Sequence, residues 1–278
     1  MKTIDTLIKD IYALFQDGKI ELRPEYVTDF GQRLASKIAS RITEVRQEPA
    51  LRISNIGKPC ERQLWFSIKH PEWGEDLPPE VRIKFSFGDI LEEYLLFLAK
   101  EAGHDVQCEQ MEVDLFGVKG HIDAIIDGCL VDCKSASSYS FNRFANHLDG
   151  SNDSFGYLGQ LGGYVQATRN YPEIKTKNHG AFLVVDKTLG HICLDIHEFP
   201  EKNWETYVQK KKNMLEGDIP PKAYAAIPDG KSGNMMLGME CSYCSFKKKC
   251  WTGVRTFLYS SGPRYLTRVE RLPDVTEV

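Results

Sequence analysis

The chain has 278 residues, of which 42% are hydrophobic and 27% are charged, and its formal net charge is −4. This composition is ordinary for a globular protein of one large or two small domains. No run approaches the roughly 18 apolar residues of a membrane span, and the N-terminus lacks the pattern of a secretory signal. We therefore expect a cytoplasmic protein that does not bind membranes. The negative charge argues against one that coats nucleic acid by bulk attraction.

The first fifty residues are expected to be helical. Apolar side chains recur at spacings of three and four between Ile4 and Phe15, and again between Val27 and Val45. This periodicity predicts two amphipathic helices. Further helices are predicted over about residues 58–69, capped by Ser54, and over residues 85–102.

The middle of the chain has the pattern of a sheet. Apolar runs over residues 118–126 and 130–134 flank Asp127-Gly128, which is a hairpin signal. Residues 135–156 are rich in Ser, Asn and Gly, which predicts a long loop of the kind that often carries function. The remaining expected elements are a helix over 157–168, strands over 181–185 and 192–196, and a helix over about 201–215. This order predicts an α/β fold with a mixed sheet.

The most informative residues are acidic side chains that interrupt two apolar strands. Asp123 lies in the first strand, and Asp132 and Lys134 lie two apart in the second, so the latter two share one face. Buried carboxylates need a compensating positive charge, and oxygen ligands favour Mg²⁺ or Mn²⁺ over Zn²⁺. Lys134 can hold a water or a phosphate beside such an ion. An ordinary hairpin with surface aspartates and a salt-bridged lysine explains the same spacing.

Two helices add candidate residues. Glu92, with Glu93 next to it, lies on the predicted helix that precedes the first strand. Downstream, Gln160 and Tyr164 are four residues apart and Tyr157 lies one turn earlier, so these side chains share a helix face. Such a face can hold a phosphate or a base edge. A plain polar helix surface is the alternative.

Together these residues resemble a known family, the PD-(D/E)XK nuclease superfamily, and within it the RecB-like branch. The family's motifs occur in its order: Gly88 with Glu92, then Gly120-His121-Ile122-Asp123, then Asp132-Cys133-Lys134, then Gln160-x-x-x-Tyr164. The resemblance implies a restriction-endonuclease-like core with Mg²⁺ or Mn²⁺ bound by Glu92, Asp123, Asp132 and the backbone carbonyl of Cys133. It also implies that Lys134 positions or activates the attacking water. Substrate contacts are expected from Gln160, Tyr164, Tyr157 and Arg143.

The cysteines carry a second signal. Cys241-Ser242-Tyr243-Cys244, followed by Cys250, has the spacing C-x2-C-x5-C. A C-x2-C turn places two thiolates on one ion or cluster, so this spacing indicates metal binding, and Cys60 is the natural fourth ligand. The remaining cysteines fit small core positions: Cys108, Cys129, Cys133 and Cys193.

The resemblance extends to these cysteines. Iron–sulfur members of the RecB-like branch, which include CRISPR-associated exonucleases and the nuclease domains of helicase–nucleases, have one cysteine before the nuclease motifs and a C-x2-C-x5-C set after them. This implies a [4Fe–4S] cluster that staples the domain, held by Cys60, Cys241, Cys244 and Cys250. A zinc ion on the same thiolates is the alternative. The expected division is an N-terminal helical segment over 1–50, a nuclease core over 51–251 and a C-terminal tail over 252–278.

The expected function is that of a Mg²⁺- or Mn²⁺-dependent deoxyribonuclease. The resemblance implies an exonuclease on single-stranded DNA ends, in recombination, repair, phage DNA metabolism or CRISPR adaptation, with protein partners in such complexes. A phage-encoded chain would act in the host cytoplasm. DNA contact is expected from local groups: Phe141, Arg143, Phe144 and the basic runs 210–212 and 247–249. The alternative is a non-catalytic nucleic-acid-binding accessory module that keeps the four-cysteine site.

Overall fold

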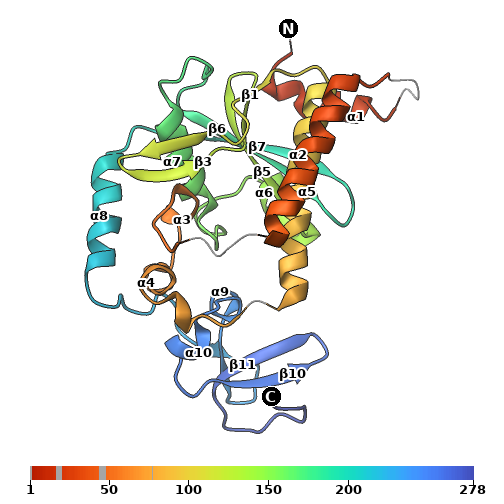
Figure 1. The fold of residues 1–278 in the computed structure, drawn as a ribbon. Helices are drawn as coiled ribbons and strands as arrows, with labels where there is room; N and C mark the ends of the chain where they lie inside the picture. The colour runs from red at the N-terminus through yellow and green to blue at the C-terminus, as the bar shows by residue number, and fades with distance from the viewer. Residues whose placement is uncertain (1, 17–20, 44–47, 77) are drawn as a thin grey trace. The chain divides into compact units, whose positions relative to one another are not determined.

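A computed structural model describes residues 2–16, 21–43, 48–76 and 78–278 (Figure 1). Its contacts divide the chain into two units. The first combines residues 1–57 with 78–209, and the second combines residues 58–77 with 210–278. Each unit is therefore assembled from segments that lie far apart in the sequence.

The first unit is mixed α/β, as the sequence pattern predicts. After a short 3-10 helix η1 (Ile4–Thr6), its helices are α1 (Leu7–Ala13), α2 (Pro24–Thr43), α3 (Ile53–Ile56), α5 (Pro79–Glu101), α6 (Ser138–Ala145), α7 (Tyr157–Thr168) and α8 (Trp204–Glu216), which ends in the second unit. Its strands are β1 (Val106–Gln107), β2 (Glu112–Leu115), β3 (Val118–His121), β4 (Ala124–Ile126), β5 (Cys129–Ala136), β6 (His179–Asp186) and β7 (Ile192–Glu198). Within the described residues, no helix is long and apolar enough to cross a bilayer.

The central sheet has five strands in the order β1-β4-β5-β6-β7. β5 and β6 run parallel, whereas the other neighbouring pairs are antiparallel. The predicted hairpin between β4 and β5 is confirmed: Ile126 pairs with Cys129, and both Asp127 and Gly128 have positive φ. A two-residue loop in which both residues have positive φ matches the twist of the flanking strands. β2 and β3 form a separate hairpin.

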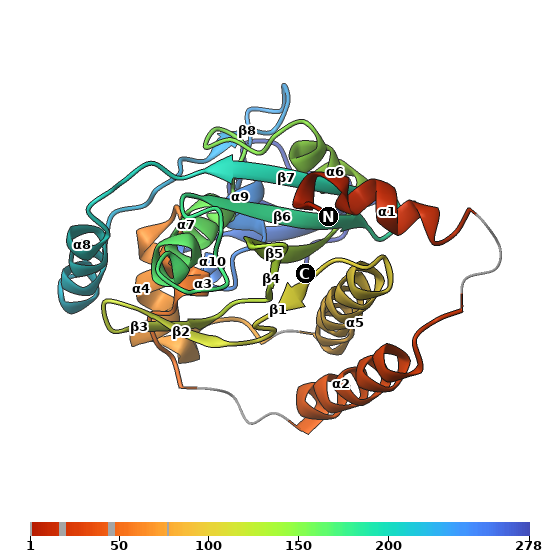
Figure 2. The same cartoon turned by 90° about the horizontal axis from the view of Figure 1, so that it is seen from above.

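Two buried clusters cover the two faces of this sheet. Alternate side chains of β4, β5 and β6 pack on one face against α1 and α5, and on the other face against α3, α6, α7 and α8. Figure 2 accordingly shows α5 and α7 on opposite sides of β4 and β5. Since successive strand residues point to opposite faces, Asp132 and Lys134 lie on the α7 side.

A close crossing of two backbones holds α7 in place. A Cβ built on Gly57 would lie 2.2 Å from the carbonyl oxygen of Gly156 and 2.8 Å from the Cα of Gly159. A Cβ on Gly159 would lie 2.5 Å from the Cα of Gly57. The residue after α3 thus contacts the first turn of α7 at a distance that only glycine permits.

The segment predicted as a long loop is largely ordered secondary structure. β5 continues to Ala136, and α6 follows, with Ser137 as its N-cap: the hydroxyl oxygen accepts from the N–H of Ser140 at 3.4 Å. Phe141 and Phe144 are buried in the core, 9% and 4% exposed. The predictions that residues 135–156 form one loop and that these rings stack on bases are therefore wrong.

The second unit contains α4 (Glu61–Lys69), the 3-10 helix η2 (Pro71–Trp73), the four-residue helices α9 (Met239–Ser242) and α10 (Lys247–Cys250), and the strands β8 (Ile227–Pro228), β9 (Met235–Met236), β10 (Arg255–Tyr259) and β11 (Gly262–Arg268). Its sheet has the order β10-β11-β9-β8. The C-terminal segment, expected as a tail, thus supplies a hairpin. Ser54 lies inside α3, so the prediction that it caps the next helix is wrong; Cys60 is the N-cap of α4.

Candidate functional site

The two aspartates predicted from the strand pattern lie opposite each other. β4 and β5 pair with Ala124 opposite Val131, and this antiparallel register, continued by one residue, sets Asp123 beside Asp132. Asp132 is 3% exposed. Oδ2 of Asp123 accepts a hydrogen bond from the backbone N–H of Cys133 at 2.7 Å. The strand pairing therefore positions both carboxylates without a ligand.

Lys134 lies on the same sheet face as Asp132, as the spacing predicts. Its ammonium forms an ion pair with Oδ2 of Asp132 and lies 5.3 Å from the ring centroid of Tyr157. Burial alone would lower the pKa of Lys134, but the charges of Asp132 and Asp123 outweigh burial and hold that pKa above its ordinary value. Lys134 is therefore a fixed cation at the carboxylates.

α5 distinguishes between the two neighbouring glutamates. Burial raises the pKa of Glu92, and the charges of Glu93 and Asp132 add to this shift. Burial likewise raises the pKa of Asp123 well above its usual range, with Glu92 as the next cause. Glu93 instead forms an ion pair with Arg33 at 2.9 Å. The pKa shifts thus couple Glu92 to the two aspartates, whereas Glu93 pairs with Arg33 of α2.

A lysine of the N-terminal helix reaches the same group. Nζ of Lys37 on α2 lies 2.6 Å from Oε1 of Glu92 and 2.8 Å from Oε1 of Glu93. The side-chain amide of Gln110 donates to the same Oε1 of Glu92 at 2.6 Å. Sequence reasoning missed Lys37, because the amphipathic pattern predicts α2 but not the helix against which its polar side chains lie.

α7 presents its polar face to the carboxylates, as the four-residue spacing predicts. The side-chain amide of Gln160 donates to Oδ1 of Asp132 at 3.1 Å. Tyr164 is 4% exposed, and burial raises its pKa, so its hydroxyl stays protonated. A Cβ on Gly120 would lie 2.8 Å from the Tyr164 ring. The glycine of the G-x-x-D string therefore makes room for the tyrosine of the Q-x-x-x-Y helix.

The donor set fits a hard divalent cation. Glu92, Asp123 and Asp132 offer carboxylate oxygens, which are the ligands that Mg²⁺ and Mn²⁺ prefer. Among the described residues, Oδ2 of Asp132 is buried and has no partner with hydrogen-bond geometry, although the Lys134 ammonium lies close to it. A buried acceptor in this state has a free lone pair for a ligand. The backbone carbonyl of Cys133, on the same strand, stays a predicted ligand.

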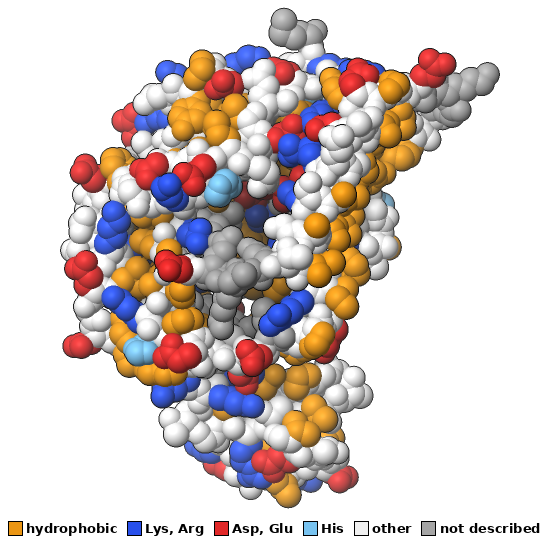
Figure 3. Space-filling model, viewed as in Figure 1, with side chains coloured by type: hydrophobic (Ala, Val, Ile, Leu, Met, Phe, Trp, Pro, Cys, Tyr) orange, Lys and Arg blue, Asp and Glu red, His pale blue; other side chains and the backbone are white. Residues whose placement is uncertain are grey.

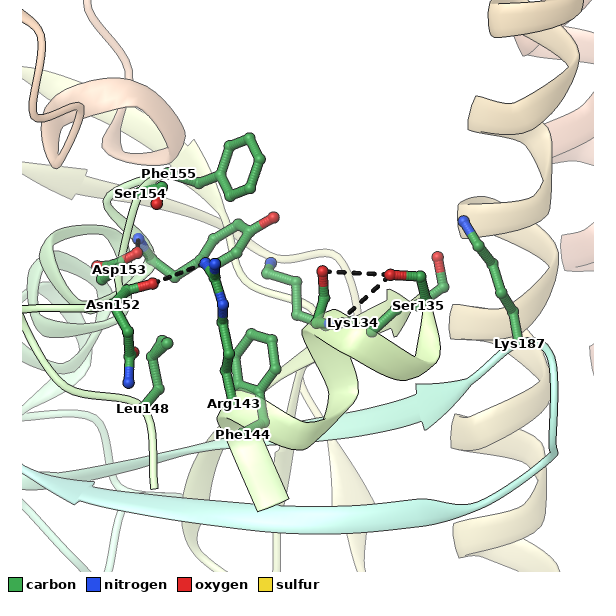
Figure 4. Close-up of a pocket in the computed structure, with 14 residues that line it drawn as sticks. Lys134, Ser135, Arg143, Phe144, Leu148, Asn152, Asp153, Ser154, Phe155 and Lys187 are labelled. Carbon is green, nitrogen blue, oxygen red and sulfur yellow. Dashed lines mark hydrogen bonds between the residues drawn. The ribbon is translucent and has the colours of Figure 1, made fainter. Parts of the chain in front are cut away.

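A pocket opens beside Lys134 (Figure 4). It is lined by the end of β5, by α6, by the segment that precedes α7 and by Lys187. Arg143, one of the predicted substrate contacts, stands in its wall. The Arg143 guanidinium donates to the carbonyl oxygen of Asn152 at 2.9 Å and to the hydroxyl of Tyr139 at 3.2 Å. Arg143 and Lys134 thus share one cavity.

The four predicted cluster cysteines lie together in the second unit, where one small pocket is lined by Cys60, Cys241, Cys244 and Cys250. Burial raises the pKa of Cys244 to about 11, and the other thiols oppose its ionisation. In the described part of the chain, no three of these sulfurs lie within 4.8 Å of one another.

A second donor group lies outside the predicted residues. Nδ1 of His147 and Nε2 of His197 lie 2.8 and 2.9 Å from the two carboxylate oxygens of Asp195. The imidazole rings, however, are stacked with centroids 4.3 Å apart and planes at 18°. A histidine nitrogen binds a metal along a lone pair in its ring plane, so stacked rings are poorly placed to share an ion. The signal that sequence reasoning passed over was the pair Asp195 and His197, two apart on one strand.

The basic runs belong to the second unit, and one lysine of each is buried in an ion pair. Lys211 pairs with Glu61 at 2.9 Å, and Lys247 pairs with Glu75. On the face drawn in Figure 3, acidic and basic side chains are interspersed and no broad basic surface stands out. Phosphate contact by these runs stays a prediction.

Comparisons with known proteins add little to this geometry. No protein-family model matches the chain, and a search of curated proteins finds no relative. Among solved structures, the chain is similar to one titled "Crystal structure of SSO0001", with 16% sequence identity and a TM-score of 0.40 over 81% of this chain and 96% of that chain. A similarity this low carries no argument, so a functional conclusion has to rest on the residues themselves.

Proposed function

We propose that the protein is a Mg²⁺- or Mn²⁺-dependent deoxyribonuclease that acts as an exonuclease on single-stranded DNA ends. The observation that carries this proposal is the convergence of Glu92, Asp123, Asp132 and Lys134 beside the end of the β4–β5 ladder. Gln160 completes the group through its hydrogen bond to Asp132. An ordinary hairpin with surface aspartates does not account for the burial of Asp132, which is 3% exposed.

The residues divide the work of phosphodiester hydrolysis between them. When bound, a divalent cation supplies Lewis acidity to the phosphate and acidifies a water. Glu92, Asp123 and Asp132 would hold the cation, and Gln160 keeps Asp132 oriented through its amide. Lys134 keeps its charge beside Asp132, so it can hold the attacking water or a phosphate oxygen but is poorly suited to accept a proton. The water oxygen bonds to phosphorus while the bond from phosphorus to the 3′ oxygen breaks.

The preference for DNA and for single-stranded ends comes from the resemblance to RecB-like nucleases. Two observations support a local rather than a broad contact with nucleic acid. The net charge is −4, and the drawn face carries interspersed charges (Figure 3). Binding then depends on cations close to the site, such as Arg143 in the pocket beside Lys134.

In the second unit we place the proposed [4Fe–4S] cluster on Cys60, Cys241, Cys244 and Cys250. The shared pocket supports a common ligand, and the resemblance to the iron–sulfur members of the RecB-like branch favours a cluster over a single zinc ion. None of the four lies on β4 or β5, so the role of the cluster is structural. Visible absorbance and metal analysis of anaerobically purified protein distinguish iron from zinc.

The nuclease proposal is tested with end-labelled single- and double-stranded oligonucleotides. We expect nucleotides to be released from the single strand in Mn²⁺ and no release in EDTA. Lys134→Ala should be inert, whereas Lys119→Ala, which removes an exposed lysine paired with Glu112 on the β2–β3 hairpin, should retain wild-type activity. Tight binding of the oligonucleotide by the wild type without any cleavage would instead identify a non-catalytic accessory module.

A further inference from the structure

We infer that the pocket beside Lys134 binds the terminal nucleotide of the substrate, with the phosphate on its cations and the base against an exposed aromatic ring. This inference rests on the proposed nuclease function and adds a structural reason for its preference for ends. The pocket measures about 220 Å³. That is below the usual range for a drug-sized ligand, so the cavity is too small for a base pair.

The pocket begins at the candidate catalytic site. Lys134 contributes to both, since it pairs with Asp132 on the sheet and also lines the cavity (Figure 4). From there the wall continues through the hydroxyl of Ser135 on β5 and those of Ser137 and Ser140 at the start of α6. A nucleotide in this cavity would therefore lie directly next to the phosphate that is cleaved.

Basic residues outnumber acidic ones among the residues that line the pocket. Arg143, Lys134 and Lys187 line it, and within the described chain no acidic group forms an ion pair with the exposed side chain of Lys187. Asp153 is the only acidic residue among the lining residues. Its carboxylate accepts three backbone N–H groups at 2.9 Å where α7 begins, at residues 156–158. Lys134 pairs with Asp132, whereas Arg143 has N–H groups beyond those that it donates to Asn152 and Tyr139. Arg143 and Lys187 are therefore the lining cations that a phosphate can bind.

One wall of the pocket offers a ring for stacking. Phe155 is 49% exposed and lies 5.5 Å from Tyr157, centroid to centroid, with 33° between the planes. Tyr157 in turn lies 5.3 Å from the Lys134 ammonium. A single-stranded base can cover the exposed face of Phe155, and such stacking tolerates any base. Cation, ring and hydroxyls thus occur in the combination that a nucleotide needs.

The hydrogen bond between Arg143 and Asn152 explains why a chain end fits best. It joins α6 to the segment before α7 across one side of the cavity (Figure 4). A strand that continued past the pocket would have to pass this bridge. A terminal nucleotide stops before it.

The binding test uses deoxyadenosine 5′-monophosphate and 3′-monophosphate, titrated separately into the wild-type protein in EDTA by calorimetry. We expect one isomer to bind and deoxyadenosine without phosphate to bind at least about tenfold more weakly. Phe155→Ala should weaken the nucleotide at least about fivefold, the lower end of a lost stacking contact. Phe15→Ala, which truncates an equally simple exposed ring outside the pocket, should leave binding unchanged. Lys187→Ala should weaken the nucleotide but not the nucleoside.

Three outcomes overturn the inference: neither isomer binds, Phe155→Ala behaves like Phe15→Ala, or inorganic phosphate binds as tightly as the nucleotide. A cleavage assay separates this failure from failure of the proposed function. Linear single strands should be degraded and a circular single strand spared. If linear and circular single strands were degraded at equal rates, the protein would be a nuclease, but the pocket would not select strand ends. Nucleotide binding without any cleavage in Mn²⁺ would support the binding pocket and contradict the proposed nuclease function.

Discussion

The carboxylate site and the cysteine site are built in contrasting ways. Asp123 lies one residue before β4 and opposite Asp132 of β5, in a sheet whose two faces are covered by large buried clusters. The cysteines lie on a helix cap and on the four-residue helices α9 and α10 with their connecting turns. The first site is therefore held by the backbone of a sheet, whereas little regular structure holds the second.

This difference indicates which of the two sites needs a bound ligand to keep its structure. No comparable apolar cluster occurs within the described residues of the second unit, where the buried apolar side chains are Leu64, Trp65, Phe66, Leu215, Leu237, Phe246, Phe257 and Leu266. Small units with little core need a metal or other cross-link to be stable. We expect the carboxylate site to keep its geometry without metal and the second unit to lose its fold without a cluster.

The largest expected effect is on catalysis. Lys134→Ala and Asp132→Ala should each lower the cleavage rate at least about 10²-fold, because each removes a group on which the charged transition state depends. The far-UV circular dichroism of the first unit's sheet and helices should be unchanged, since the ladder and its buried faces remain. Single-turnover cleavage of an end-labelled oligonucleotide measures the rate. If either variant cleaved at nearly the wild-type rate, the substituted residue would not be part of the catalytic site.

The next effect concerns stability of the second unit alone. Cys60→Ala should abolish the cluster's visible absorbance and lower the free energy of unfolding of this unit by at least ~3 kcal/mol. Limited proteolysis should then cut within residues 210–278 while 78–209 persists. Cys193→Ala, a half-buried cysteine on β7, is the matched control and should keep the absorbance. Equal proteolysis of both variants would contradict the contrast between the two units.

The third prediction concerns how thermal stability depends on pH through the carboxylate site. Burial, with the charges of Glu92 and Asp132, raises the pKa of Asp123. An acid whose pKa is raised in the folded state stabilises the fold most at low pH, and that contribution is lost as pH rises through the folded pKa. In EDTA, Asp123→Asn should therefore gain thermal stability relative to wild type as pH rises above 3.8. Thermal melts from about pH 4 to 8 measure the difference, and a constant difference would argue against a buried, ionisable Asp123.

The smallest expected effect tests the contact from α2. The Lys37 ammonium contacts Oε1 of Glu92, so it competes with a metal ion for this oxygen. Lys37→Ala should therefore tighten Mn²⁺ binding about two- to fivefold, which matches the free energy of a partly exposed ion pair. Arg41→Ala is the control, because Arg41 pairs with Asp89, one turn away on α5. Calorimetry with Mn²⁺ measures both. Identical affinities in the two variants would indicate that Glu92 does not bind the ion.

Local patterns predicted much of the carboxylate site. The alternation around Asp132 and Lys134, the Asp127-Gly128 turn and the helical spacing of Gln160 and Tyr164 all depend on near neighbours, and the structure has each of them. Such local patterns could not predict which segments, distant in the sequence, contact each other. Nothing local distinguishes Glu92 from Glu93, because the choice depends on how α5 is rotated against α2 and the sheet.

The missed elements have physical reasons as well. Phe141 and Phe144 follow the helical spacing of α6, but the surrounding Ser and Asn residues conceal it, since they also suit caps and turns. Cys60 caps α4 with a sulfur, which accepts from the N–H of Gln63 at 3.4 Å, and thiols are not among the usual cap residues. The short strands of the second unit are two residues long in two cases, too short to show alternation.

The crossing of Gly57 and Gly159 has a consequence for which substitutions the chain can tolerate. Neither residue has a side chain that could take part in chemistry, yet a single added methyl group at either would have to displace the backbone that leads into Gln160. In a library of random point mutants selected for activity, these two positions should be as invariant as Asp132. Their intolerance would come from space alone, so a map of mutational sensitivity would mark them as functional although they touch no substrate.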